Sequence, residues 1–240
     1  MGRTYKTQAI VLRSLRFSEA DRILHLYTSD RGRIGAIAKG VRKTKSRFGA
    51  RLEPLSHVEL MLHEGSGELQ TITGVELLRS HHTVRESIYR LNAGLIGAEA
   101  MLRLFGEPEA NERAFTALAR FLDLLDDAPD GEHPELDPLV LSFQLKLLWL
   151  AGYLPHLTTC VECGETELVG FSARAGGAVC REHATGALAL SQDGLAAVEG
   201  LLSAPLADAA GMPPGGRAAL AVITSSYEEH GGFRLRTLSA

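Results

Sequence analysis

The spacing of apolar residues changes about one third of the way along this chain of 240 residues. Up to that point apolar and other residues alternate, as around Leu24 and Leu26, and a period of two is typical of strands. From Val84 onward apolar residues recur at steps of three and four, which is typical of helices that bury one face. We therefore expect an α+β multidomain protein, with strands in residues 1–80 and helices in residues 81–240.

The first domain is expected to contain five strands. One surrounds Ile10 and Leu12, and residues 22–40 form a hairpin. Residues 57–77 form a second hairpin, in which the odd-numbered residues of 69–77 share one face. Five strands with a basic loop between the third and the fourth predict an OB-fold barrel, a fold that often binds oligonucleotides. An SH3-like barrel fits the pattern nearly as well.

The second domain is expected to be helical apart from one short insert. Its apolar stripes predict helices over residues 84–105, 115–125 and 139–150, and two more after residue 190. Gly106 and Pro108 are expected to end the first of these helices. Trp149 belongs to the stripe of the third helix and is expected in the core rather than in a cofactor pocket.

The formal net charge of −4 conceals two oppositely charged parts. Residues 1–55 hold thirteen Lys or Arg and four acidic residues, a charge of +9, so the remainder carries −13. A basic part joined to an acidic part favours binding of a polyanion by the basic part. The acidic helices would be repelled by DNA and are better suited to contacts with proteins.

A basic loop, residues 39–51, is the candidate DNA-binding site. It contains no acidic residue, and its Gly and Ser content predicts a loop rather than a helix. Its basic residues are Lys39, Arg42, Lys43, Lys45, Arg47 and Arg51. Such residues bind phosphates without regard to sequence, through release of counterions. Phe48 is the best candidate for stacking on a base, although an aromatic residue in a strand-rich domain is more often core, and a merely solvated loop is the alternative for the whole segment.

A candidate metal site uses all three cysteines of the chain. Cys160 and Cys163 form one pair, and Cys180 and His183 form a second pair after sixteen intervening residues. This spacing is typical of a structural zinc site, and it predicts a zinc-finger-like element at about residues 157–186 that holds one Zn²⁺ ion. Four protein ligands leave no open position for catalysis. The alternative is a chance packing of cysteines in the core, whereas the order of the motif argues against a zinc deaminase.

The sequence contains no motif of an enzyme. A Walker-type phosphate loop, a nucleophile elbow and a regular cluster of acidic metal ligands are all lacking, so we expect no catalysis and no small-molecule substrate. The opening residues have no long apolar segment, and the most apolar stretch, residues 139–154, is interrupted by Gln144 and Lys146. We therefore expect neither a signal peptide nor a membrane span, and a cytoplasmic location.

Four segments of the chain together resemble the RecO family of bacterial recombination mediators. They are QAIVLRSLRFSEADRILHLYT, DRGRIGAIAKGVRKTKSRFGARLEPLSHVELML, GVELLRS and LKLLWLAGYLPHLTTCVECG, and the resemblance extends over nearly all of the chain. The resemblance implies an N-terminal OB-fold, a helical C-terminal domain and an embedded zinc-finger-like element. It places the family's basic residues at Lys39, Arg42, Lys43, Lys45 and Arg47, and its metal ligands at Cys160, Cys163, Cys180 and His183.

The resemblance also implies a function in DNA repair and homologous recombination. It implies binding of single- and double-stranded DNA, annealing of complementary strands and, with RecR and in some settings RecF, loading of RecA onto DNA coated by single-strand-binding protein. Such a protein would act on the nucleoid. Two other functions stay open, namely a zinc-containing adaptor for protein interactions that binds nucleic acid only weakly and, in third place, a nuclease that uses the metal.

Overall fold

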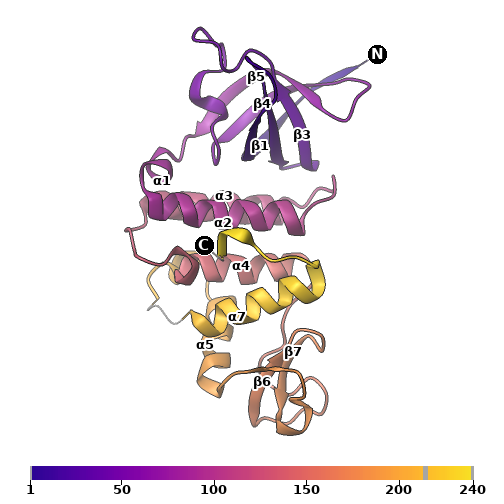
Figure 1. The fold of residues 1–240 in the computed structure, drawn as a ribbon, viewed down its shortest axis with the longest axis vertical. Coiled ribbons are helices and arrows are strands. Elements are labelled where there is room, and N and C mark those ends of the chain that lie inside the picture. Colours follow the sequence, from indigo (N-terminus) through magenta and orange to yellow (C-terminus); the bar gives the residue numbers. More distant parts are fainter. Residues whose placement is uncertain (1, 213–215, 239–240) are drawn as a thin grey trace.

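The computed structural model describes residues 2–212 and 216–238. The described chain forms three parts stacked along the long axis of the molecule, namely a barrel at one end, helices in the middle and a small sheet at the other end (Figure 1). No helix within the two described ranges is both long enough and apolar enough to span a membrane.

The N-terminal part is a closed five-stranded barrel. Its strands are β1 (Arg3–Arg16), β2 (Arg22–Thr28), β3 (Gly32–Ala38), β4 (His57–Glu64) and β5 (Gln70–Arg79). They close in the order β1-β2-β3-β5-β4, because β1 pairs with both β2 and β4 and β3 runs parallel to β5. This arrangement is that of the OB-fold, which confirms the predicted fold of the domain.

The middle of β1 is buried on both faces because it lies between two cores. Ala9 and Val11 belong to the core inside the barrel, whereas Ile10 and Leu12 belong to the core that the helices form. A strand with one face in water would alternate apolar and polar residues. The uninterrupted apolar run of β1 therefore marks the contact of the barrel with the helices.

The predicted facing of β5 is wrong in its first half. Ile72 is buried in the barrel, whereas Thr73 is exposed. Met61 of β4 pairs with Gly74 and the next residue, Leu62, pairs with Ile72, so that Thr73 is the extra residue of a β-bulge. The bulge reverses the alternation along the strand, which the sequence pattern does not reveal.

The helices follow the predicted stripes except for one break and for one short extra helix, α6 (Leu206–Ala209), between the two predicted after residue 190. They are α1 (His82–Glu86), α2 (Ile88–Leu104), α3 (Glu112–Asp127), α4 (Pro138–Leu150), α5 (Gln192–Ser203), α6 (Leu206–Ala209) and α7 (Arg217–Ser226). The single helix predicted over residues 84–105 is thus wrong, because Ser87 has an extended backbone and its hydroxyl accepts a hydrogen bond from the backbone N–H of Arg90 as the N-cap of α2. Ile88, at the start of α2, is 82% exposed.

The predicted burial of Trp149 is also wrong. Most of α4 is buried among the other helices, as the central ribbon of the helical layer shows (Figure 1). Trp149 lies in the last turn of α4, is 45% exposed, and has the guanidinium of Arg113 at 5.7 Å from its ring centroid. An apolar stripe identifies a helix, but it does not show which turns of that helix other residues cover.

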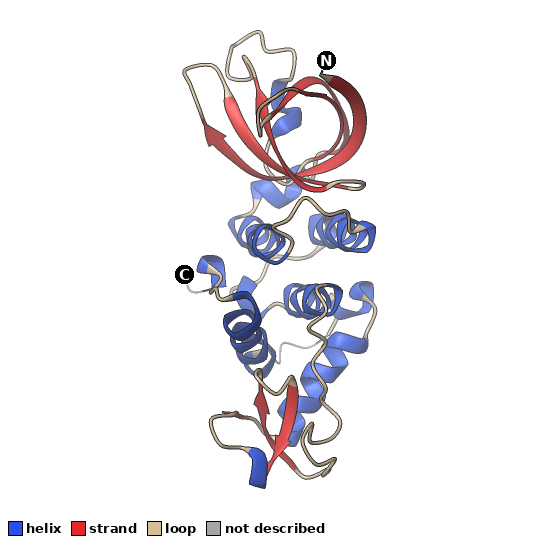
Figure 2. Ribbon diagram, turned by 90° about the vertical axis from the view of Figure 1, so that its right-hand side faces the viewer, coloured by secondary structure: helices blue, strands red, loops and turns tan. Residues whose placement is uncertain are grey.

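A small sheet interrupts the helices between α4 and α5. Its strands are β6 (Leu168–Ser172), β7 (Gly177–Cys180) and β8 (Leu188–Ala189), in the order β7-β6-β8. It forms the end of the molecule opposite the barrel (Figure 2). The sequence predicts a zinc-finger-like element at about residues 157–186, a range that contains β6 and β7, whereas β8 lies just beyond it.

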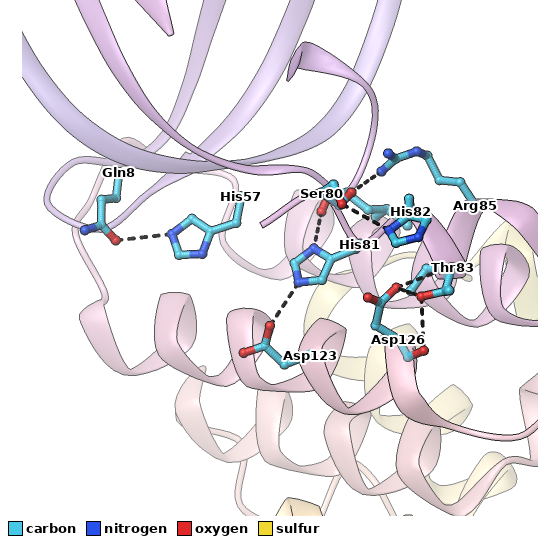
Figure 3. A network of polar contacts seen from close by, with 11 residues as sticks. Gln8, His57, Ser80, His81, His82, Thr83, Arg85, Asp123 and Asp126 are labelled. Carbon is cyan, nitrogen blue, oxygen red and sulfur yellow. Dashed lines mark hydrogen bonds and ion pairs between the residues drawn. The ribbon is translucent and has the colours of Figure 1, made fainter. Parts of the chain in front are cut away.

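Polar contacts tie the end of the barrel to the helices (Figure 3). The hydroxyl of Thr83 and the backbone N–H of Val84 both donate to the Oδ1 atom of Asp126 in α3. His81, two residues beyond β5, is 2% exposed and contacts Asp123 of α3. The barrel therefore joins the helical part through a fixed, polar turn rather than through a free linker.

Candidate metal centre and nucleic-acid interface

The four predicted metal ligands come from two turns held together by the small sheet. Cys160 and Cys163 lie in the turn that precedes β6, and this turn is closed by a hydrogen bond from the backbone N–H of Gly164, which has a φ of 79°, to the carbonyl oxygen of Cys160. Cys180 is the last residue of β7, and His183 ends the short 3₁₀ turn that follows. A backbone hydrogen bond from Val161 to Ala178 of β7 ties the two turns together.

The donor atoms of the four residues converge on one point. The Sγ, Sγ, Sγ and Nδ1 atoms of Cys160, Cys163, Cys180 and His183 all lie within 4.8 Å of one another. Sγ of Cys163 lies 3.7 Å from Sγ of Cys180, and Nδ1 of His183 lies 3.3 Å from Sγ of Cys180 and 3.6 Å from Sγ of Cys160. A tetrahedral zinc ion with Zn–S distances of about 2.3 Å would separate two sulfurs by about 3.8 Å. The cluster therefore has the size of a tetrahedral metal site and can hold one ion.

Local hydrogen bonds favour the thiolate form of Cys160. Burial alone would raise the pKa of the Cys160 thiol, but backbone N–H groups of Cys180, Glu162 and Cys163 donate to its sulfur and lower the pKa to about 6. A thiolate is the form of cysteine that binds a metal. Cys160 and Cys180 are buried, so the cluster lies in the interior of the insert.

The basic loop lies on the barrel between β3 and β4. All six of its predicted DNA-binding residues, namely Lys39, Arg42, Lys43, Lys45, Arg47 and Arg51, are exposed. The ammonium groups of the three lysines make no hydrogen bond or ion pair with any part of the chain that the structure describes. The ammonium groups of these three lysines can therefore bind phosphate groups.

The three arginines of the basic loop have contacts within the protein. The Nη1 atom of Arg42 donates to the carbonyl oxygens of Ser18 and Glu19, which ties the loop to the turn between β1 and β2. The Nη1 atom of Arg51 donates to the carbonyl oxygen of Arg47 at 3.1 Å. These arginines fix the shape of the loop and leave part of each guanidinium free.

Phe48 is not available for stacking on a base. Its side chain is 1% exposed and packs with Leu52 in the barrel core, so that the alternative of a core residue is the right one. The guanidinium carbon of Arg47 lies 4.8 Å from the centre of its ring. Phe48 thus anchors the basic loop from inside the barrel.

A second group of basic residues was missed by the sequence analysis. Arg13, Arg33, Arg103 and Arg236 line one pocket between the barrel and the helices, together with His25. They are far apart in the sequence and belong to both domains, so no local run of charge reveals them. The alternation of residues along β3 could have indicated one of the four, because it places the side chain of Arg33 on the outer face of the barrel.

Comparisons with known proteins cover both parts of the chain. The family model described as Recombination protein O N terminal matches residues 1–81, and the one described as Recombination protein O C terminal matches residues 85–239. The DNA repair protein RecO of Rubrobacter xylanophilus is 45% identical over 181 residues, which are 74% of this chain and 71% of that protein.

Other relatives extend the match to nearly the whole chain. The DNA repair protein RecO of Anaeromyxobacter sp. (strain K) is 34% identical over 241 residues, which cover 96% of this chain and 92% of that protein. That of Alkaliphilus metalliredigens is 35% identical over 179 residues, with 74% and 71% covered. Both family models match, and the barrel, the helices and the cluster of three cysteines and one histidine are all in place, so the chain belongs to the RecO family.

Proposed function

We propose that this protein binds single- and double-stranded DNA through the basic loop and acts without catalysis as a mediator of DNA repair and recombination. The observation that carries the proposal is the set of three exposed, unpaired lysines, Lys39, Lys43 and Lys45, on an OB-fold barrel. The names of its relatives support the role, because each is a DNA repair protein RecO.

The basic loop would promote pairing of complementary strands by neutralising phosphates. Lys39, Lys43 and Lys45 would contact the backbone, with Arg42, Arg47 and Arg51 adding the free parts of their guanidinium groups. Neutralised strands repel each other less, so that their bases can pair, and this step needs no ATP. Because Phe48 is buried, the binding rests on the backbone and is independent of sequence.

The cysteine cluster would hold a structural Zn²⁺ ion. Three thiolates and one imidazole nitrogen form the donor set that zinc takes in closed, four-ligand sites. With no position left for water, the ion would supply stability to the insert at about residues 157–186 and no chemistry. Cys160, Cys163, Cys180 and His183 are its proposed ligands.

The two domains would divide the work. Residues 1–80 would bind DNA, whereas the acidic helical domain, residues 81–240, would contact RecR and single-strand-binding protein and so act indirectly with RecF on the loading of RecA in the cytoplasm. The charge of −13 over residues 56–240 supports this division, since DNA repels such a surface.

A strand-annealing assay tests the proposal most directly. The full chain should accelerate pairing of two complementary oligonucleotides, both naked and coated with single-strand-binding protein. The isolated barrel is unsuitable because Ile10, Leu12 and Tyr27 pack into the core of the helical part. If the protein binds other proteins of the pathway but neither binds nor anneals DNA, the adaptor function replaces the one proposed here.

A further inference from the structure

A pocket of about 520 Å³ lies between the outer face of the barrel and helix α2. Its walls come from β1, β2 and β3 on one side and from residues 95–103 of α2 on the other, and residues 236–237 close one end. The C-terminal turn that carries residues 236–237 lies beside the helical layer under the barrel (Figure 2). The pocket is thus shared by both domains.

A β-bulge in β1 turns two side chains toward this pocket. Val11 pairs with Leu26 inside the barrel, whereas Arg13 pairs with His25, which faces outward. Leu12 is the extra residue, so Leu12 and Arg13 both line the pocket. Bulges often occur where a strand must aim a side chain at a ligand.

The pocket holds an excess of positive charge. Arg13, Arg33, Arg103 and Arg236 line it, and none of their guanidinium groups makes an ion pair with a carboxylate within residues 2–212 and 216–238. Burial, followed by the charges of Arg33 and Arg13, lowers the pKa of His25. The two arginine charges thus add to the effect of burial on this imidazole.

The single acidic residue of the lining is already in use. The carboxylate of Glu99 accepts hydrogen bonds from the backbone N–H groups of Arg236 and Thr237 and from the Thr237 hydroxyl. Burial would raise the pKa of Glu99, but the hydrogen bonds from Thr237 and Arg236 together hold it below its ordinary value. The charge of Arg103 also lowers the pKa of Glu99, so this carboxylate partly offsets Arg103 while it fixes the C-terminal turn. One carboxylate against four guanidinium groups still leaves the lining with an excess of positive charge.

We propose that this pocket binds one nucleotide unit of a single DNA strand, with its phosphate on the guanidinium groups and its apolar portion against Leu12, Leu95 and Leu102. Guanidinium groups bind phosphate oxygens in a bidentate manner, and the volume suits a ligand of nucleotide size. The outer face of strands two and three is also where OB-folds bind oligonucleotides. The inference rests on the proposed DNA binding, which it extends from the basic loop to the joint between the domains.

The test replaces one arginine from each domain, as Arg33→Gln with Arg103→Gln. Affinity is measured by fluorescence anisotropy for a labelled oligothymidylate and by calorimetry for thymidine 5′-monophosphate. The oligonucleotide affinity of the double variant should fall about tenfold or more, and the slope of its salt dependence should fall by about 1. The matched control is Arg174→Gln with Arg234→Gln, which removes the same charge where each arginine pairs with a glutamate of the helical domain.

The outcomes separate this inference from the proposed function. Unchanged oligonucleotide affinity in the double variant overturns nucleotide binding by the pocket. In that case, loss of affinity in a variant of the three loop lysines would still support DNA binding by the basic loop. Binding of the mononucleotide but not of the oligonucleotide assigns the pocket to a free nucleotide and overturns its role on a strand. If the double variant unfolds early, the single variants Arg33→Gln and Arg103→Gln give the same test.

Discussion

The Nε2 atom of His81 lies 3.1 Å from Oδ1 of Asp123, across the joint between the barrel and α3 (Figure 3). The Nδ1 atom of the same ring donates to the carbonyl oxygen of Leu55 at 2.8 Å. His81 and Leu55 both have a positive φ, of 44° and 68°. A non-glycine residue in this region costs on the order of 1 kcal/mol or more and keeps the conformation only where its surroundings hold it. The ring of His81 therefore connects two strained turns to the helical domain.

Replacing this ring should weaken the whole molecule. His81→Ala removes both hydrogen bonds and leaves the Leu55 carbonyl without its donor, so we expect a loss of about 2 to 4 kcal/mol in the free energy of unfolding. Urea denaturation measures the loss. The adjacent variant His82→Ala is the control, since His82 is exposed and should change stability little. Equal stabilities of the two variants would contradict the role given to His81.

Gly32 marks a close approach of the barrel to the loop after α2. Its φ is 64°, and a Cβ atom at this position would lie 2.1 Å from the carbonyl oxygen of Glu109. Gly32→Ala should lower the free energy of unfolding by about 2 kcal/mol or more, because strain and overlap with backbone add. Gly67→Ala is the control, since its Cβ would meet nothing within 4 Å and its φ is not positive. Thermal unfolding of both variants measures the difference, and equal unfolding temperatures of the two variants would contradict the close approach at Gly32.

The loop lysines should account for a defined part of the salt dependence. Each phosphate contact contributes about 0.7 to the slope of log affinity against log salt for single strands, so replacing Lys39, Lys43 and Lys45 with Ala should lower the slope by about 2. Fluorescence anisotropy over a range of salt concentrations measures it. The control removes three exposed charges from the helical domain through replacement of Arg174, Arg217 and Arg234 with Ala. If the salt dependence of the lysine variant has the same slope as that of the wild type, the basic loop does not bind the DNA backbone.

Much of the fold follows from local patterns, and the errors occur where distant parts meet. The cysteine spacing predicted all four members of the cluster because each pair is held by one local turn, which the sequence encodes directly. The break at Ser87 also had a local signal, a serine that can cap a helix, but the continuous apolar stripe outweighed it.

Other features depend on contacts that no local pattern contains. Phe48, the candidate for stacking on a base, lies in the barrel core, which is the alternative that the sequence left open. Trp149 is half-exposed because the last turn of α4 is only partly covered by other residues. The bulge at Thr73 depends on the partner strand, and the arginine pocket assembles Arg13 and Arg103 from two domains. Periodicity shows which face is apolar but not what covers it.

Removal of the metal should destabilise the small sheet. A structural zinc ion contributes several kcal/mol to the folding of such an element, so a strong chelator or the variant Cys163→Ser should lower the unfolding temperature and abolish bound zinc in elemental analysis. His183→Cys should keep the metal, because a thiolate is an equivalent ligand. His133→Ala, far from the cluster in the sequence, serves as the control. A zinc-free protein with the unfolding temperature of the wild type would contradict a structural site.

The stability of the protein should depend on pH through His57, whose ring contacts Phe115 of α3 where the barrel meets the helices. Burial first, and then the charges of His81 and Arg79, lower the pKa of His57 below its ordinary value of 6.5, and Asp123 opposes them only in part. The unfolded chain therefore binds this proton more tightly than the folded protein, so stability is complete above about pH 6.5 and falls as the pH drops toward the lowered pKa.

His57→Gln should flatten this dependence, since glutamine keeps a polar group beside Gln8 but takes up no proton. Urea denaturation of the wild type and the variant between about pH 5 and pH 7.5 measures the difference, because the ordinary histidine pKa of about 6.5 falls inside this range. His133→Gln is the matched control, because the side chain of His133 is 65% exposed. Stability curves of wild type and His57→Gln that run parallel over this range would show that protonation of His57 does not act on the joint.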